Sequence, residues 1–355
     1  MTAAVRMSPL AERHARVAPA VEAAALGVLR SGGYVRGPEG AALEAALAAL
    51  HGRAHAVGVG SGTDALAFAL QALGVGPGDE VIVPAVGFYG TAAAVLALGA
   101  VPVLADVLPG RPLLCPAAAA AAVGPRTVAV VPVHLYGDLA EDPALPGLAV
   151  VDDLAQAIGR RPPGGPGRAA ALSFYPTKAL GAAGDGGMVL TDDASVAAAV
   201  RALGHQGYGP DGLHHAAAGA APRNSRLDEL QAAIVRAQLP DLGARLARRR
   251  AVAAAYDAVL GARALPRDAE SPVSVYAFRV AGRDAARAAL AARGVESAVY
   301  YPVALGDQPA LAGRVRGGPA PAARAFCAQV LCVPCHEALT DDEVARVCAA
   351  LEELA

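Results

Sequence analysis

The sequence contains no tryptophan and only five phenylalanines among its 355 residues, and it lacks any long uninterrupted apolar run. Hydrophobic residues make up 55% of the chain, but no stretch reaches the roughly 20 apolar residues that span a membrane. Residues 1–16 carry several charged side chains and no apolar centre, so we expect no signal peptide. The net charge of −2 gives no general attraction to nucleic acid. These absences predict a cytoplasmic protein with neither a membrane nor a nucleic-acid partner.

Cysteine is scarce as well, and the five thiols cannot form a complete set of disulfides. Their number and spacing do not resemble a disulfide framework, which again favours the cytoplasm. The run Cys332–His336 fits the C-x-x-C-H pattern of covalent haem attachment. Attachment of haem requires export, however, and Val330–Val333 has the composition of a short core strand. We therefore expect no haem and no metal site.

The most informative stretch is Ser173–Lys178, followed by the glycine-rich run Gly184–Gly187. Residues 169–175 are mostly small and apolar, which predicts a buried strand, and Pro176 ends it. A second strand is expected at Met188–Thr191. A lone lysine between glycine-rich turns is ordinarily a solvated loop residue. Other parts of the sequence decide whether Lys178 serves a site instead.

A candidate anion-binding turn precedes Lys178 in the chain. Residues 56–60 predict a strand and residues 65–73 a helix, with Ser61, Gly62, Thr63 and Asp64 between them. At such a turn, free backbone N–H groups and the positive end of the helix dipole face the same point. The alternative is an ordinary N-cap formed by a serine or threonine side chain.

Further candidate residues follow two other predicted strands. The strand at 148–151 ends in Asp152 and Asp153, with Gln156 shortly after, and the carboxyl ends of parallel strands form the usual ligand crevice of an α/β sheet. One of these carboxylates could instead cap a helix. Phe88 lies in a glycine-flanked loop after the strand at 80–84. Its ring could stack on a planar ligand, or it could pack in the core.

Strands and helices alternate as far as Thr191, which predicts an α/β protein with a doubly wound, mostly parallel sheet. We assign residues 1–240 to this large domain, including its N-terminal helices. Residues 241–355 are expected to form a smaller α+β domain, with strands at 273–280, 295–301 and 330–333. Tyr34 lies in a turn-rich loop that could be a connector or could line a substrate site.

Together these parts match the needs of pyridoxal phosphate. Its phosphate needs backbone and hydroxyl donors, and its ring needs a flat partner. Its pyridine nitrogen needs a carboxylate, and its aldehyde needs an amine that can form a Schiff base. The candidates are Gly62, Thr63, Asp64, Phe88, Asp153, Gln156, Ser173 and Lys178.

The sequence also resembles the DegT/DnrJ/StrS family of pyridoxal-phosphate-dependent sugar aminotransferases, over nearly its whole length. These enzymes have the aspartate aminotransferase fold, fold type I, with a large cofactor domain and a smaller C-terminal one. Several sequence blocks in the family's order carry the resemblance, and they are Gly58–Leu66, Gly78–Pro84, His134–Gly137, Asp152–Ala157, Ser173–Lys178, Gly184–Gly187 and Asn224–Ala233.

The resemblance implies a role for each block. Lys178 would form the Schiff base and then move the proton between cofactor and substrate carbon. Asp153 would pair with the pyridinium nitrogen, Gln156 would contact the ring hydroxyl, and Phe88 would stack on the ring.

The phosphate would be held by Thr63 and the backbone at Asp64, in the turn that includes Gly62, and by Ser173. Asn224 would reach the phosphate bound by a second subunit. The resemblance therefore implies a homodimer with active sites at the subunit interface.

The implied reaction moves an amino group from L-glutamate to the keto group of a TDP- or UDP-linked keto-deoxysugar. The residues expected to contact the sugar nucleotide are Tyr34, Tyr175, Arg226 and Tyr300. Alternatives are transamination of a keto-cyclitol and a cofactor-binding regulator without turnover. Dehydration of a deoxysugar is a further alternative, but that branch has histidine in place of the lysine.

Three positions depart from the family pattern. Gly87 stands where a threonine is usual, and His205-Gln206 replaces part of an Arg-x-His-Gly run. Tyr300 stands where many members have histidine before Tyr-Pro. The last two departures fall where the family binds its nucleotide sugar, so they leave the substrate open.

Overall fold

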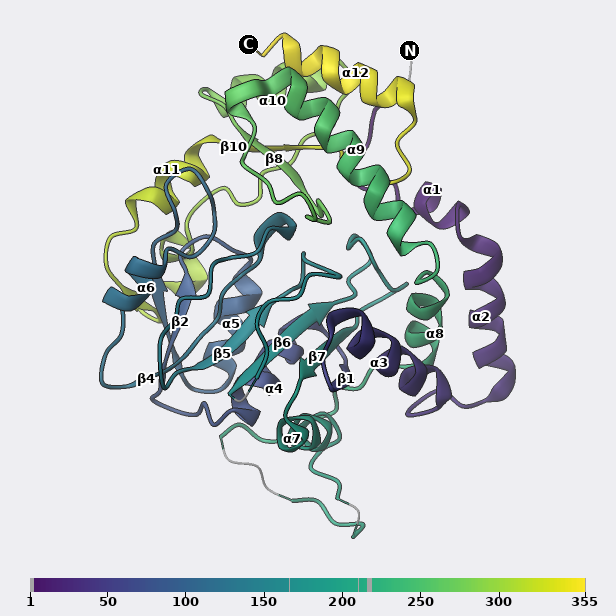
Figure 1. Cartoon of the computed structure of the whole chain (residues 1–355), viewed down its shortest axis with the longest axis vertical. Coiled ribbons are helices and arrows are strands. Elements are labelled where there is room, and N and C mark those ends of the chain that lie inside the picture. Colours follow the sequence, from purple (N-terminus) through teal and green to yellow (C-terminus); the bar gives the residue numbers. More distant parts are fainter. Residues whose placement is uncertain (1–2, 166, 210, 216–218, 355) are drawn as a thin grey trace.

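The computed structural model describes residues 3–165, 167–209, 211–215 and 219–354. An eight-stranded sheet lies at its centre with helices on both faces, and a smaller two-stranded sheet lies above it under the longest helix (Figure 1). The strand order of the large sheet is β1-β7-β6-β5-β4-β2-β3-β9. Its strands are β1 (His55–Val59), β2 (Glu80–Pro84), β3 (Val101–Ala105), β4 (Thr127–Val130), β5 (Ala149–Asp153), β6 (Arg168–Ser173), β7 (Gly187–Thr191) and β9 (Arg316–Gly317).

Most neighbouring strands of this sheet are parallel, and only β7 runs against its two neighbours. The predicted α/β class with a mostly parallel sheet is confirmed. Since β1 and β6 are both antiparallel to β7, they are parallel to each other. Val59 and Ser173 both pair with Gly187, so the turn after β1 and the loop after β6 leave the sheet at the same level.

Alternate residues along each strand pack into different cores, as expected for a sheet covered on both faces. In β6, Ala169 and Ala171 contact the core under one set of helices, whereas Ala170 and Leu172 contact the core under the other. The first face is covered by α4 (Gly62–Ala72), α5 (Tyr89–Ala97) and α7 (Ala194–Gly204). The opposite face is covered by α3 (Pro38–His51), α6 (Pro116–Ala121) and α8 (Glu229–Ala237).

The smaller part is built on an antiparallel pair, β8 (Tyr276–Arg279) and β10 (Val330–Val333). Its helices are α9 (Leu242–Leu260), α10 (Arg283–Ala292) and α12 (Asp341–Glu352). In Figure 1, α9 runs diagonally from the end of α8 to the top of the molecule, so it joins the two parts. The N-terminal helices α1 (Leu10–Ala15) and α2 (Ala18–Ser31) lie beside α8 and the lower end of α9 (Figure 1).

Segments near each end of the chain pack on the part of the structure that the rest of the chain around them does not belong to. Helix α11 (Pro321–Gln329) and β9 pack on the large sheet, where Phe326 joins its core, although both lie late in the sequence. Conversely, Val5 belongs to the small core and bridges to Val295. The domain boundary at residue 240 stays a prediction. Short 3₁₀ turns complete the elements, at Leu135–Gly137, Gly261–Arg263, Leu305–Asp307 and Pro309–Leu311.

The prediction of a strand at 295–301 is wrong. This segment makes only isolated bridges, one of them between Ala298 and Cys332 of β10. Beyond that bridge the chain leaves the sheet, because Tyr300 and Tyr301 face a cavity and Pro302 has no N–H to donate to a neighbouring strand. Within the described part of the chain, no helix is long and apolar enough to cross a membrane.

Candidate active site

A cavity of about 650 Å³ opens at the carboxyl edge of the large sheet, where the smaller part covers it. The parallel strands end there, so loops after β1, β2, β5 and β6 contribute side chains to one space. The lining includes most of the predicted site residues, which are Gly62, Thr63, Phe88, Asp153, Gln156, Ser173, Tyr175, Lys178 and Tyr300. The predicted residues Asp64, Asn224, Tyr34 and Arg226 do not line it.

Lys178 enters the cavity from the loop after β6. Its backbone N–H donates to the carbonyl of Tyr175 at 2.8 Å, which closes a tight turn after the strand. Burial lowers the pKa of the Lys178 amine from its ordinary value of 10.5, and the Asp153 carboxylate acts in the opposite direction. Lys178 is also the only lysine in the sequence. The site therefore contains an amine that loses its proton more readily than an exposed lysine does.

This pKa direction predicts how the amine reacts with acetic anhydride, because only an unprotonated amine attacks the anhydride. In the cofactor-free protein, the pH at which acetylation of Lys178 is half-maximal should lie below 10.5, since the buried ammonium form is disfavoured. Peptide mass spectrometry separates Lys178 from the α-amino group, and unfolded protein is the control. A half-maximal pH equal to that of unfolded protein would contradict the burial of the amine.

Asp153 ends β5 and is held from two sides. Its Oδ2 accepts a hydrogen bond from the Thr91 hydroxyl at 2.8 Å, and its Oδ1 accepts one from the Ala155 N–H at 3.1 Å. The residue is only 6% exposed. The two donors fix the direction of the carboxylate and leave it available to a cationic group in the cavity.

Gln156 is positioned by two tyrosines. Its Oε1 accepts the backbone N–H of Tyr136 at 2.7 Å, and Tyr136 has a left-handed backbone with φ of 64°. A non-glycine residue in this region is unusual and clusters at functional sites. The Tyr301 hydroxyl is hydrogen-bonded to the Gln156 side chain, and burial raises the pKa of Tyr301, so its hydroxyl keeps its proton.

The turn after β1 forms the start of α4, as the anion-site reading requires. Ser61 is the N-cap, and its Oγ accepts the N–H of Asp64 at 3.1 Å. A Cβ at Gly62 would lie 2.7 Å from the Cβ of Ser173, so only glycine lets the turn approach β6 this closely. The N-cap alternative is confirmed for Ser61. Gly62 and Thr63 line the cavity, and their binding of an anion stays a prediction.

Asp64 contacts residues on the side of the turn away from the cavity. Its carboxylate accepts hydrogen bonds from Arg223 and from the Ser225 hydroxyl, the latter at 2.7 Å. Its N–H already donates to Ser61. Asp64 therefore ties the turn to residues 223–225, and its predicted contact with a phosphate stays a prediction.

Replacing Gly62 with alanine should disturb this cradle. The added methyl would meet Ser173, which we expect to cost about 1–3 kcal/mol of stability, and it should weaken binding of pyridoxal phosphate. Thermal unfolding and a cofactor titration measure both effects. The matched control is Gly87→Ala, because a Cβ at Gly87 meets nothing within 4 Å. Equal behaviour of the two variants would show that the close approach does not matter.

Phe88 is exposed at the cavity rather than packed in the core, with 60% of its surface accessible. Its ring lies 6.3 Å from that of Tyr301, tilted by 37°. A Cβ at Gly90 would come within 2.8 Å of the Phe88 ring and 3.0 Å of the Thr63 hydroxyl. Because Gly90 has no side chain, the Phe88 ring and Thr63 can lie close together on one wall of the cavity. This arrangement suits a flat ligand that carries a phosphate.

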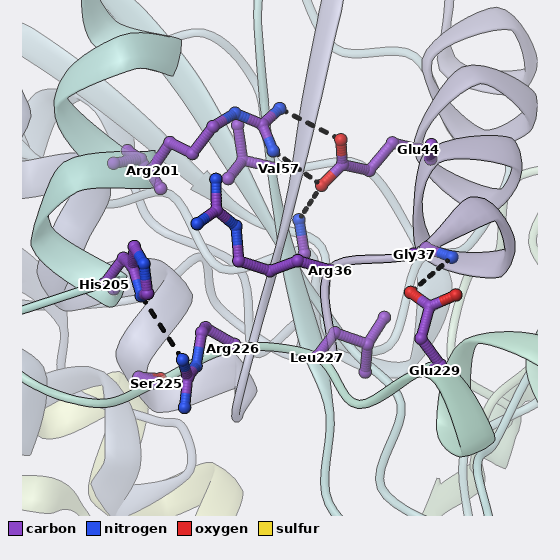
Figure 2. A pocket seen from close by; sticks show the side chains of 15 residues that line it. Arg36, Gly37, Glu44, Val57, Arg201, His205, Ser225, Arg226, Leu227 and Glu229 are labelled. Carbon is purple, nitrogen blue, oxygen red and sulfur yellow. Dashed lines mark hydrogen bonds and ion pairs between the residues drawn. The ribbon is translucent and has the colours of Figure 1, made fainter. Parts of the chain in front are cut away.

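The predicted residues outside the cavity lie elsewhere on the chain. Asn224 and Tyr34 are exposed, and the Tyr34 hydroxyl donates to the carbonyl of Leu29 at 3.4 Å. Arg226 lines a second hollow of about 200 Å³. Figure 2 shows Arg36, Arg201 and Arg226 around this hollow, with the Arg226 guanidinium on His205 and Arg201 paired with Glu44.

Several residues of the site carried no sequence signal. Thr91 and Tyr301 reach Asp153 and Gln156 only through tertiary packing. No motif marks Thr91, and the Tyr-Pro pair that includes Tyr301 indicates no contact with Gln156. The C-x-x-C-H run lies in β10 and the buried segment after it, where burial raises the pKa of Cys332 and Cys335 to about 12. Among the residues that the structure describes, no group of three or more His, Cys, Asp or Glu side chains could hold a metal ion.

The donor set fits pyridoxal phosphate. A glycine cradle with a helix start suits the phosphate, an exposed ring suits stacking, a fixed carboxylate suits the pyridinium, and a buried lysine suits the aldehyde. Together with a mostly parallel sheet, this arrangement defines the class of α/β pyridoxal-phosphate enzymes.

Residues 17–352 match the DegT/DnrJ/EryC1/StrS aminotransferase family, so the chain belongs to this family. It is 40% identical over 358 residues to an Acidithiobacillus ferrooxidans protein described as UDP-N-acetyl-3-dehydro-alpha-D-glucosamine 3-aminotransferase, covering 96% of this chain and 95% of the other. It is 41% identical over 353 residues to the dTDP-3-amino-3,4,6-trideoxy-alpha-D-glucose transaminase of Streptomyces venezuelae, covering 94% and 92%.

Solved structures give the same result. The crystal structure of Streptomyces venezuelae DesV in complex with a ketimine intermediate aligns with a TM-score of 0.93 at 39% identity, covering 99% of this chain and 98% of that one. Bacillus subtilis NtdA, solved with bound cofactor PMP, aligns with a TM-score of 0.87 at 25% identity, covering 100% and 86%. The predicted family, fold class, enzyme class and pyridoxal-phosphate cofactor are confirmed.

Proposed function

We propose that this aminotransferase takes an amino group from L-glutamate and transfers it to the keto group of a nucleotide-linked keto-deoxysugar in the cytoplasm. The observation that carries the proposal is the shared cavity, in which Lys178, Asp153 and Gln156 face tyrosines 175, 300 and 301. Lys178, Asp153 and Gln156 suit the cofactor. The tyrosines supply hydroxyls and flat apolar faces, which suit a sugar.

Each residue has a definite task in this proposal. Bound pyridoxal phosphate supplies an aldehyde that accepts the amino group and a protonated ring that draws electrons from the reacting carbon. Lys178 would hold the cofactor covalently, and its Nζ would give and take the proton at the reacting carbon of the substrate. Its lowered pKa suits this task, because the neutral amine can accept a proton. Asp153 would keep the ring nitrogen protonated.

The positioning of these groups follows from their neighbours. Thr91 and the Ala155 N–H orient Asp153, and Tyr136 orients Gln156 toward the ring hydroxyl. Phe88 would stack on the ring, and Gly62, Thr63 and Ser173 would hold the phosphate. The smaller part covers the cavity with Tyr276 and Tyr301, which limits access of water to the reacting atoms.

The relatives offer two nucleotides at nearly equal identity, UDP at 40% and dTDP at 41%, so the experiment must include both. The amine form of the enzyme, made with L-glutamate, is mixed with UDP-linked and dTDP-linked 3-keto sugars and with a keto-cyclitol. We expect an amino sugar nucleotide by mass spectrometry from one of the first two. Amination of the cyclitol alone would refute the proposed substrate class.

We also propose that the active unit is a homodimer. Asn224, Tyr34 and Arg226 lie outside the cavity of their own chain, where they cannot serve its ligand. In a symmetric dimer the same surface of a second copy could bring them to the first copy's cavity.

Mixing two inactive variants tests this arrangement. In a hybrid of Lys178→Ala and Asn224→Ala chains, one of the two sites regains both intact residues. Random mixing should therefore restore about a quarter of the wild-type activity, because half of the dimers are hybrids. Each variant alone is the control. Activity no higher than the sum of the parents would place Asn224 at its own chain's site or outside any site.

A further inference from the structure

A buried carboxylate lies behind the lysine loop, and three arginines surround it. Glu337 follows β10 and is 2% exposed. Its Oε1 accepts hydrogen bonds from Arg13 at 2.8 Å and Arg245 at 2.9 Å, and its Oε2 accepts one from Arg249 at 2.9 Å. Burial raises the pKa of Glu337, but the three guanidiniums together lower it by more, so the carboxylate stays charged.

Two of these arginines also bind the backbone that carries Lys178. Arg13 donates from its Nη2 to the carbonyl of Lys178 at 2.7 Å and from its Nη1 to the carbonyl of Thr177 at 3.3 Å. Arg245 donates to the carbonyl of Ala179 at 2.7 Å. Three successive carbonyls are thus held by side chains whose charge is balanced by Glu337.

The third arginine fastens the cluster to the smaller part. Arg249 donates to the carbonyls of Val273 and Cys335 at 3.2 and 3.1 Å. The cluster therefore joins α1, α9 and the segment after β10 to the loop after β6. A flexible loop would leave the Lys178 amine free to sample many positions, whereas these bonds fix the backbone from which it extends.

We propose that Glu337 and Arg13 are positioning residues for Lys178. Glu337 holds the Arg13 and Arg245 guanidiniums in place, and these hold the lysine loop so that the amine reaches the cofactor aldehyde. The proposal rests on the proposed role of Lys178. It adds that residues far from Lys178 in the sequence set the reactivity of its amine by holding the backbone from which it extends.

The test uses Arg13→Met and Glu337→Gln in the full-length chain. Arg13→Met leaves Glu337 with two arginines, so it is the variant more certain to fold. Arg248→Met is the matched control, because Arg248 lies on α9 beside Arg245 and Arg249 but binds Asp341 and the carbonyl of Leu339 instead of residues 176–179. The Asp153 carboxylate, which also acts on Lys178, is unchanged in all three variants.

Two readouts follow Lys178 itself. The first is the pH of half-maximal acetylation in the cofactor-free protein, which should rise toward 10.5 in Arg13→Met as the amine gains solvent. The second is the rate at which pyridoxal phosphate becomes attached to Lys178, trapped with borohydride and located by mass spectrometry. We expect this rate to fall about 10- to 100-fold in Arg13→Met and Glu337→Gln, and to be unchanged in Arg248→Met.

The outcomes distinguish the positioning role of Arg13 and Glu337 from the proposed role of Lys178. A lower unfolding temperature in folded Arg13→Met, with both readouts as in the wild type, would make the cluster merely structural and overturn the proposal. Failure of wild-type Lys178 to become attached would overturn the proposed function instead. The acetylation readout needs no cofactor, so it still decides whether the cluster positions the amine.

Discussion

Replacing Lys178 with alanine is expected to lower kcat by about 10⁴-fold, because the variant loses the group that holds the cofactor and moves the proton. It should also lose the visible absorption of the lysine-bound cofactor. No other side chain can take over, since the sequence contains no second lysine. Steady-state kinetics and the absorption spectrum measure the two losses.

The matched control is Lys178→Arg, which keeps the positive charge and the length of the side chain. A guanidinium cannot be deprotonated at ordinary pH, so this variant should be as inactive as Lys178→Ala. Both variants should unfold near the wild-type temperature. Substantial turnover in either one would place the chemistry on another group and remove Lys178 from the centre of the account.

Replacing Asp153 with asparagine is expected to lower kcat by about 10²- to 10³-fold while the cofactor remains attached to Lys178. Asparagine keeps the shape of the side chain and can still accept from Thr91, but it lacks the charge that holds a proton on the ring nitrogen. The loss should therefore fall on kcat rather than on cofactor binding. Kinetics and a cofactor titration separate the two.

Asp152→Asn is the control for this variant. Asp152 is the adjacent carboxylate, but it accepts a hydrogen bond from His134 at 3.0 Å and does not line the cavity. It should keep most of the wild-type kcat. If Asp153→Asn were as active as Asp152→Asn, Asp153 would have no special relation to the ring nitrogen.

The parts of the site that follow strand ends could be predicted from the sequence. Hydrophobic runs locate β5 and β6, and parallel strands bring their carboxyl ends to one edge, so Asp153 and Lys178 were expected near each other. The anion turn at Gly62 and Thr63 could be predicted as well, because it joins a predicted strand to the start of a predicted helix. These predictions depend on short stretches of chain and on the general geometry of a parallel sheet.

The supporting contacts could not be predicted in this way. Thr91 and Asp153 are 62 positions apart, and Arg13 and Glu337 are 324 apart. Such pairs depend on how whole elements pack, and no local sequence pattern links the two partners. A charged residue such as Glu337 is also normally exposed, so its burial among arginines could not be read from composition.

The strand predicted at 295–301 shows another limit of sequence patterns. Its β-forming residues satisfy the composition of a strand, but Tyr300 and Tyr301 are used to line the cavity. A residue's preference for extended backbone does not tell whether a neighbouring strand is there to pair with it. At a sheet edge that borders a cavity, side chains can line the cavity even where their residues favour a strand.

The measurement that tests the central claim most directly is the visible absorption spectrum of the purified protein before and after addition of L-glutamate. We predict an absorption band from cofactor bound to Lys178 that disappears with glutamate, as the cofactor takes up the amino group. The band should be absent from Lys178→Ala. A wild-type protein that binds pyridoxal phosphate but keeps its band in glutamate would contradict the proposed donor, and one that binds no cofactor would contradict the account of the site.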